Sequence, residues 1–312
     1  GRILYQETIA GPVEGVGHFE PLRHYAEVHL LLEPLPRGSG LQFRTDCSTD
    51  ALTINWQRLV LTHLKEREHI GVLTGSPVTD LRFTLVAGRA SNKHTEGGDF
   101  REATYRAVRQ GLRKAENILL EPYYAFTLDI PTDYVGRAMT DLSNMNAHFG
   151  SPEMKGERAV LEGTAPVVAM RNYHQELMVY TKGLGSLSLR FSGYDRCHNP
   201  EEVILARGYD PDQDILNPCA SVFCAHGTGF IVPFDEVESY MHVESPLELE
   251  GPVEKRDFEA DALRLERMHE GKKDEGYKSG GHYIADQELE DIFVRTYGPI
   301  KNRAKDMNIA SA

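Results

Sequence analysis

The stretch YYAFTLDIPTDYVGRAM, residues 123–139, contains the clearest change of secondary structure in this 312-residue sequence. The β-branched and aromatic residues of 124–130 predict a strand, which Pro131 ends because proline cannot continue the hydrogen bonds of a sheet. Apolar residues at helical spacing then predict a helix over 133–149. The residues that form its apolar stripe are Tyr134, Ala138, Leu142 and Met145.

The residues that follow complete a regular order of elements. Strands are predicted over 151–155 and 158–165, meeting at Gly156, then a helix over 168–181 and a strand over 186–194. The order βαββαβ is that of a ferredoxin-like domain, in which two helices cover one face of a four-stranded antiparallel sheet. The sequence therefore predicts an α+β protein in which residues 121–196 form a ferredoxin-like domain.

Residues 1–120 predict a separate α+β domain. Alternating apolar residues indicate strands over 3–9, 13–19, 25–32, 41–47 and 78–86. A helix is expected from Asn55, because apolar residues recur there at helical spacing. A second helix is expected to begin at Asp99, and we expect its basic side to be solvated. The basic residues of that side are Arg101, Arg106, Arg109, Arg113 and Lys114.

Acidic residues are concentrated in the last third of the chain. The net charge is −13, yet residues 199–312 alone hold 12 Lys and Arg against 24 Asp and Glu. The first two domains are close to neutral, so they can present basic side chains to phosphate. We expect residues 197–312 to form an acidic carboxy-terminal extension, partly disordered near 246–285. It is expected to pack on the second domain through Phe223, Phe230, Ile231, Phe234, Ile292 and Phe293.

No motif in the sequence points to catalysis. A phosphate-binding loop, a dinucleotide fingerprint, a nucleophile elbow and a His-Glu-x-x-His motif are all missing. Cys219, Cys224 and His226 could bind zinc as part of an RNA-processing module, together with the pair Cys197 and His198. Their spacing is irregular, so buried apolar thiols are favoured and neither a catalytic nor a metal-binding residue is predicted.

Histidines also cluster near the first strands. His18, His24 and His29 could share a site, because alternation places every second residue on the same face of a strand, but surface positions are favoured. The sequence has no apolar run long enough to cross a membrane, so no membrane partner is expected.

Several short motifs resemble a known family. The segments 6–9 (QETI), 34–40 (PLPRGSG) and 119–122 (LLEP) look like the fourth domain of elongation factor G and its relatives. The βαββαβ unit resembles the fifth domain of that family. Residues 197–312 resemble the longer tail of members related to the tetracycline-resistance ribosomal protection proteins.

The resemblance implies a fold and a partner. The first domain would be similar to domain 2 of ribosomal protein S5. The chain would be the carboxy-terminal half of a longer cytoplasmic, monomeric GTPase, whose absent amino-terminal part binds GTP and Mg, so this fragment needs no cofactor of its own. The partner would be the ribosome, through 16S and 23S rRNA and not DNA.

The resemblance also places the contact with the decoding centre in two loops at the tip of the first domain, over 18–24 and 88–98. Arg23, Arg89 and Lys93 would bind phosphate, and Ser91 and Asn92 would bond to base edges. His24 and His94 complete the set of predicted contact residues.

The same loops help to decide which kind of family member the chain resembles more. Ser91 stands where elongation factor G presents a tip histidine, and the loop lacks the aromatic residue and proline of the classical resistance proteins. With the long tail, this favours a protection-like protein. The alternative is a housekeeping translocation factor of the elongation factor G type.

Overall fold

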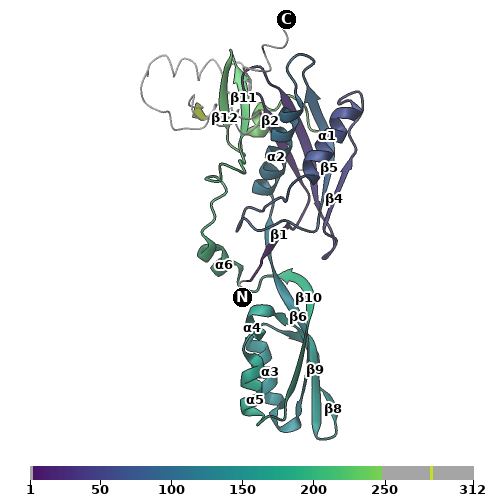
Figure 1. Ribbon diagram of the computed structural model, residues 1–312, viewed down its shortest axis with the longest axis vertical. Coiled ribbons are helices and arrows are strands. Elements are labelled where there is room, and N and C mark those ends of the chain that lie inside the picture. The colour runs from purple at the N-terminus through teal and green to yellow at the C-terminus, as the bar shows by residue number, and fades with distance from the viewer. Residues whose placement is uncertain (1–2, 248–281, 284–312) are drawn as a thin grey trace, which may run out of the picture.

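The computed structural model describes residues 3–247 and 282–283 (Figure 1). The chain folds into two bodies, each built on one β-sheet. The long strand β6 (Asn117–Pro131) belongs to the sheet of the second body and pairs at its start with β1 (Gln6–Ile9), which lies beside the first body. Residues 10–116 and the later segments 221–247 and 282–283 make the first body, and residues 117–196 make the second.

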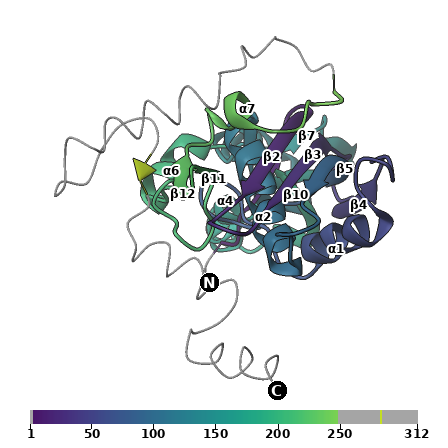
Figure 2. The same cartoon turned by 90° about the horizontal axis from the view of Figure 1, so that it is seen from above.

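The first body is a seven-stranded sheet. Its order is β13-β12-β11-β2-β3-β5-β4, which Figure 2 shows from one edge to the other for the strands from β12 to β4. Strand β11 runs parallel to β2, and β4 runs parallel to β5, while the other pairs are antiparallel. The strands are β2 (Val13–Phe19), β3 (Ala26–Pro34), β4 (Leu41–Thr45), β5 (Leu81–Ala90), β11 (Ser221–Ala225), β12 (Thr228–Val232) and β13 (His282–Tyr283).

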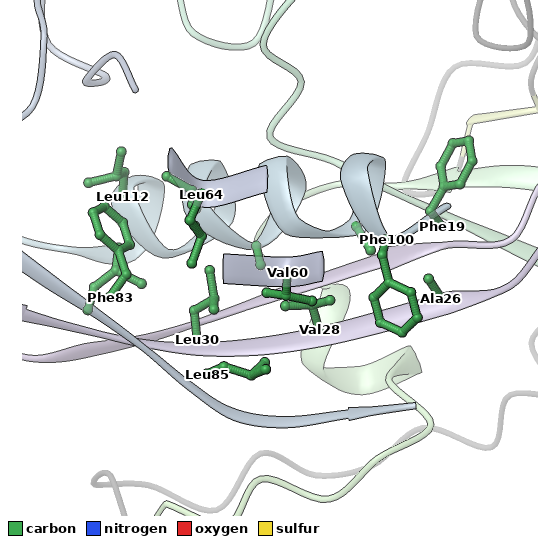
Figure 3. Packing of buried hydrophobic residues seen from close by; sticks show 14 of the residues in the cluster. Phe19, Ala26, Val28, Leu30, Val60, Leu64, Phe83, Leu85, Phe100 and Leu112 are labelled. Atoms are coloured by element: carbon green, nitrogen blue, oxygen red, sulfur yellow. The ribbon is translucent and has the colours of Figure 1, made fainter. Parts of the chain in front are cut away.

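Two helices cover one face of this sheet. Helix α1 (Ile54–Lys65) buries Val60 and Leu64, as its periodicity predicts. Helix α2 (Gly97–Lys114) begins two residues before Asp99, which accepts a hydrogen bond from the Glu96 backbone N–H at 2.8 Å in a capping box. The two helices and strands β2, β3 and β5 enclose the main core, part of which Figure 3 shows.

The second body has the predicted ferredoxin-like arrangement. Three elements differ from expectation: the first helix is shorter, because Asn146 turns the chain with a φ of 55°, the strand expected over 151–155 is replaced by two short strands over 148–149 and 153–155, and the second helix is divided in two. The elements after β6 are η1 (Thr132–Tyr134), α3 (Val135–Asn144), β7 (His148–Phe149), β8 (Glu153–Lys155), β9 (Arg158–Pro166), α4 (Val167–Met170), α5 (Tyr173–Tyr180) and β10 (Ser186–Arg196).

The extension packs on the first body, so the prediction that it packs on the second is wrong. After α6 (Pro200–Arg207), strand β11 joins the edge of the first sheet beside β2. Phe223 and Phe230 then pack with Val16 and with α7 (Val237–Tyr240) on the sheet face opposite α1 and α2. Most of the segment 246–285, and Ile292 and Phe293, lie outside the described residues.

The expectation that the basic side of α2 is solvated is wrong for two of its arginines. Arg106 and Arg109 are 3% and 4% exposed, and both bind the extension. Arg109 donates to the carbonyl of Asn217 at 3.0 Å and to the hydroxyl of Tyr209 at 2.8 Å, and Arg106 donates to the carbonyl of Ala220 at 2.8 Å. These arginines satisfy backbone carbonyls of a segment about a hundred residues away in sequence, which local periodicity cannot indicate.

A buried histidine makes the stability of the first body pH-dependent. His69 is 4% exposed and donates from Nε2 to the carbonyl of Leu64 at 2.8 Å, and burial lowers its pKa to about 4. The unfolded chain, with the ordinary pKa of 6.5, binds this proton more readily, so stability falls as pH drops from 6.5 towards 4. Between pH 7 and pH 5.5 we expect the free energy of unfolding of wild type to fall by about 1–2 kcal/mol more than that of His69→Gln, because the variant has no buried imidazole to protonate. Urea unfolding at both pH values measures this difference. The exposed His94→Gln serves as control, and an equal pH dependence in wild type and His69→Gln would contradict the expectation.

Candidate functional site

Three turns meet at one end of the first body. In the sheet register Phe19 pairs with Ala26, Ala26 with Ala90, and Val222 with Phe19. The loop between β2 and β3, the loop between β5 and α2, and the turn between β11 and β12 therefore leave the sheet at the same end. We call this end the tip.

The first two loops are fastened to each other. His24 Nδ1 lies 3.1 Å from the Asp99 carboxylate at the start of α2. The Thr95 hydroxyl donates to the Tyr25 carbonyl at 2.6 Å and accepts from the Ser91 N–H at 2.6 Å. Because these bonds join the two loops across about 70 residues of sequence, the tip is a single structure with a fixed base.

The predicted contact residues divide between the surface and the base of the tip. His24 and Ser91 are half-buried: His24 binds Asp99 across the two loops, and the Ser91 hydroxyl accepts from the Lys93 N–H within its own loop. The remaining five side chains are exposed: Arg23, Arg89, Asn92, Lys93 and His94. The Arg89 guanidinium lies 6.0 Å from the centre of the Tyr25 ring, in the range of a cation–π contact. Three exposed cations, Arg23, Arg89 and Lys93, thus lie at this end of the first body, and such side chains are the ones that bind phosphate.

The extension adds the third turn, which the sequence reasoning did not assign to the tip. Strands β11 and β12 are joined by His226 and Gly227, with φ of 50° and 81°, as a two-residue hairpin turn of this kind requires. A hollow of about 380 Å³ is lined by Leu22, Arg23, His24 and Gly227. Leu22 is 51% exposed. No local signal in the sequence connects residue 227 to residues 22–24.

A chain of buried charges lies under the tip, on the sheet face opposite the helices. His18 and His29 are fully buried, so their expected surface placement is wrong. Of the three histidines that could have shared a site, these two share Glu27, whereas His24 binds Asp99 instead. His18 Nδ1 donates to Glu27 at 2.6 Å and His29 Nε2 at 3.0 Å. The outer ends of the chain are Glu20, 3.0 Å from His18, and Glu14, 2.8 Å from His29.

This chain fixes the protonation of its members. Burial by itself lowers the pKa of His29, but hydrogen bonds to Glu14 and Glu27 outweigh it and raise the pKa to about 9. In the same way the carboxylates of Glu20 and Glu27 raise the pKa of His18. Burial opposes ionisation of Glu27, but the bonds from the two imidazoles hold its pKa below the ordinary range. Alternating charges therefore stabilise one another here.

The extension also binds this buried chain. The Glu27 carboxylate accepts the backbone N–H groups of His242 at 2.9 Å and Val243 at 2.7 Å. The His18 ring stacks on Phe223 with 4.0 Å between ring centres. One buried carboxylate thus joins two strands of the first domain to a segment more than 200 residues away.

The cysteines near residue 220 do not form the zinc cluster considered from the sequence. Within residues 3–247, Cys219, Cys224 and His226 do not come together as a group of three ligand atoms. Burial raises the pKa of both thiols, which disfavours the thiolate that binds metal. Cys219 is 4% exposed, in keeping with the expectation that it is a buried apolar thiol.

Comparison with known proteins agrees with this architecture. The family model for elongation factor G, domain IV, matches residues 1–116, and the model for the elongation factor G C-terminus matches residues 118–203. The first 203 residues belong to the elongation factor G family. Domain IV thus supplies the β2–β3 and β5–α2 loops of the tip, whereas the turn between β11 and β12 lies beyond both matched regions.

Individual relatives are similar at about the same level. Tetracycline resistance protein TetP of Clostridium perfringens is 32% identical over 193 residues, which cover 61% of this chain and 29% of that protein. Elongation factor G of Aquifex pyrophilus is 31% identical over 209 residues, 65% of this chain and 30% of that protein. The chain therefore spans less than a third of the length of these curated relatives.

The fold is also similar to a solved structure. A crystal structure of a protein from Thermus thermophilus has a TM-score of 0.57 at 25% identity, covering 67% of this chain and 32% of that one. The predicted α+β fold class, with an S5 domain 2-like domain followed by a ferredoxin-like domain and an extension, is confirmed. Among the described residues, every helix is too short or too polar to span a membrane.

Proposed function

We propose that this chain is the ribosome-binding carboxy-terminal half of a cytoplasmic translational GTPase of the elongation factor G and tetracycline-resistance ribosomal protection family. Its tip contacts rRNA near the decoding centre, and the chain acts as a monomer. GTP and Mg are bound by the amino-terminal part of the parent protein. The similarity to TetP and to elongation factor G supports the family role in translation.

The observation that carries the proposal is the construction of the tip. Arg23, Arg89 and Lys93 are exposed there, while the bonds of His24 and Thr95 hold the loops that carry them. Phosphate contacts supply much of the affinity of proteins for nucleic acid, and a fixed base reduces the entropy lost on binding. The exposed Asn92 adds a side chain that can donate to and accept from an unpaired base.

We favour a protection-like role over housekeeping translocation. The reason is that the extension, through the turn at Gly227, contributes to the same surface as the domain IV loops. A tip widened by a third turn presents a different shape to the decoding centre than two loops alone. We expect the full-length protein to hydrolyse GTP in the presence of ribosomes without supporting translocation. Assays of GTP hydrolysis and of translocation with the full-length protein measure this.

The tip makes a direct prediction. Replacing Asn92, Lys93 and His94 together by alanine is expected to leave the melting temperature nearly unchanged, because the side chains are exposed. In the full-length protein it is expected to weaken ribosome binding and activity, at about 1–3 kcal/mol for each lost contact. Co-sedimentation with ribosomes over a range of salt concentrations measures this, and the Lys93 contribution is expected to shrink as salt rises.

A matched control distinguishes the tip from basic charge in general. Lys155 ends strand β8 of the second body and is also exposed, and Lys155→Ala is expected to bind ribosomes as wild type does. Figure 1 shows β8 at the end of the second body that lies away from the first. Normal ribosome-dependent activity of the triple variant, or its failure to fold, would show that the loop is passive and only leads into α2.

A further inference from the structure

Three side chains of metal-binding type converge at the base of the tip. They are His18 at the end of β2, Glu20 just after it, and His242 in the segment after α7, and their ligand atoms all lie within 4.8 Å of one another. The His18 and His242 rings have centres 4.6 Å apart at 70°, and His18 Nε2 lies 3.0 Å from Glu20. Two ligand atoms bonded to one tetrahedral zinc at ordinary lengths lie about 3.3 Å apart. His18 Nε2 and the Glu20 carboxylate would therefore need to move only slightly to bind the same ion.

The surroundings of the two imidazoles match those of metal ligands. Histidines that bind metal hold one ring nitrogen with a carboxylate, carbonyl or other oxygen, which orients the ring and directs the other nitrogen at the ion. His18 Nδ1 is held by Glu27 at 2.6 Å, and His242 Nδ1 lies 3.0 Å from the hydroxyl of Tyr25. Glu27 is itself fixed by the backbone N–H groups of residues 242 and 243. The supporting bonds therefore exist already, and an ion bound at His18 Nε2 would replace the proton that this nitrogen shares with Glu20.

The ligand chemistry selects the ion. Mg²⁺ and Ca²⁺ prefer sites made of oxygen, whereas two imidazoles with one carboxylate suit Zn²⁺ and related transition metals. His18 is fully buried, but Glu20 and His242 are half-buried, so solvent reaches the cluster from one side. We propose that His18, Glu20 and His242 bind a divalent transition-metal ion of the zinc type, with the fourth position taken by water.

A second cluster of similar composition is a weaker candidate. In the group of Glu121, Cys197 and His198, both the Nδ1 and the backbone N–H of His198 bind the same Glu121 oxygen, at 2.6 and 2.7 Å. Burial and the neighbouring Glu121 raise the pKa of the Cys197 thiol to about 11, which opposes a thiolate ligand. This group therefore serves as an internal comparison for the experiment.

The ion would join two parts of the chain. His18 and Glu20 belong to domain IV, and Glu20 is the first residue of the loop that carries Leu22, Arg23 and His24. His242 belongs to the extension, outside both matched family regions. Metal binding would hold the extension against the base of the tip, and it does not depend on ribosome binding.

Titration of the metal-free 312-residue chain with Zn²⁺ tests the proposal. Calorimetry is expected to show one tight site that is lost in His242→Ala and in Glu20→Gln, while circular dichroism confirms that both variants remain folded. Tyr25→Phe removes only the hydroxyl beside His242 Nδ1 and is expected to weaken binding by about 10–100-fold. Titration with Co²⁺ is expected to give visible absorption bands typical of nitrogen and oxygen ligands, which His242→Ala abolishes.

Two control variants locate the site. His198→Ala, in the second cluster, and His94→Ala, at the exposed tip loop, are expected to bind Zn²⁺ as wild type does. The proposal is overturned if the wild-type chain binds no Zn²⁺, if His242→Ala and Glu20→Gln bind it unchanged, or if His198→Ala is the variant that loses it.

Discussion

Replacing Gly17 by alanine is expected to destabilise the first body by about 3 kcal/mol or more. A Cβ atom at Gly17 would lie 1.9 Å from the carbonyl oxygen of Ala103 and 2.4 Å from the backbone nitrogen of Ala107, both in α2. These are backbone atoms and cannot rotate aside, so the helix would have to move away from β2. That movement would separate Phe100, Ala103 and Ala107 from the core that they fill.

The single tryptophan makes this measurable for the first body alone. Trp56 in α1 packs against Phe100 with 5.1 Å between ring centres, so its fluorescence reports the unfolding of this core. Urea titration followed at Trp56 is expected to show a large loss for Gly17→Ala. Gly11→Ala is the matched control, because nothing lies within 4 Å of its added Cβ. Equal unfolding midpoints for Gly17→Ala and Gly11→Ala would contradict the close packing of α2 on β2.

Replacing Glu27 by leucine is expected to cost about 3–5 kcal/mol, because breaking a buried ion pair leaves uncompensated charge. Glu27 is fully buried and accepts bonds from His18, His29 and the backbone N–H groups of residues 242 and 243. Leucine would leave two imidazoles facing each other without the carboxylate between them. It would also leave two buried N–H donors unsatisfied, which loosens the extension as well as the sheet.

Two further variants separate charge from packing in this prediction. Glu27→Gln keeps the shape and one acceptor oxygen, so its loss of stability is expected to be smaller than that of Glu27→Leu. Glu68→Leu changes an exposed glutamate and is expected to stay within about 0.5 kcal/mol of wild type. Urea unfolding followed at Trp56 measures all three, and a Glu27→Leu variant as stable as Glu68→Leu would show that the buried charges contribute nothing.

The elements of both bodies could be predicted from local patterns in the sequence. Apolar spacing located α1, and the order of strands and helices after Pro131 identified the ferredoxin-like body. Short-range signals suffice there because each helix or strand shows its buried face in its own residues. The errors, such as the helix predicted through β7, lie at element ends, where a left-handed residue like Asn146 decides the boundary.

The exposed residues of the tip could also be predicted, since Arg23, Asn92, Lys93 and His94 lie in its loops and Arg89 lies at the end of β5 that leads into one of them. The buried chain under them could not. On β2 and β3, the alternation of Glu14, His18, Glu27 and His29 with apolar residues is that of a sheet with one solvated face. The extension covers that face, and nothing in the strands themselves indicates a cover.

The sequence by itself therefore determined the elements of both domains, their order and the ferredoxin-like arrangement of the second, because these follow from periodicity and turn residues within each segment, whereas the fold of the first domain and its tip loops were implied by the family resemblance. Only the tertiary structure decided that β11 joins β2, that Arg106 and Arg109 bind the extension, and that His242 reaches His18. The physical reason is that these contacts join residues about 100 to more than 200 positions apart. Hydrogen bonds and ion pairs across such separations depend on how the finished surfaces match, and no local pattern of residues records that match.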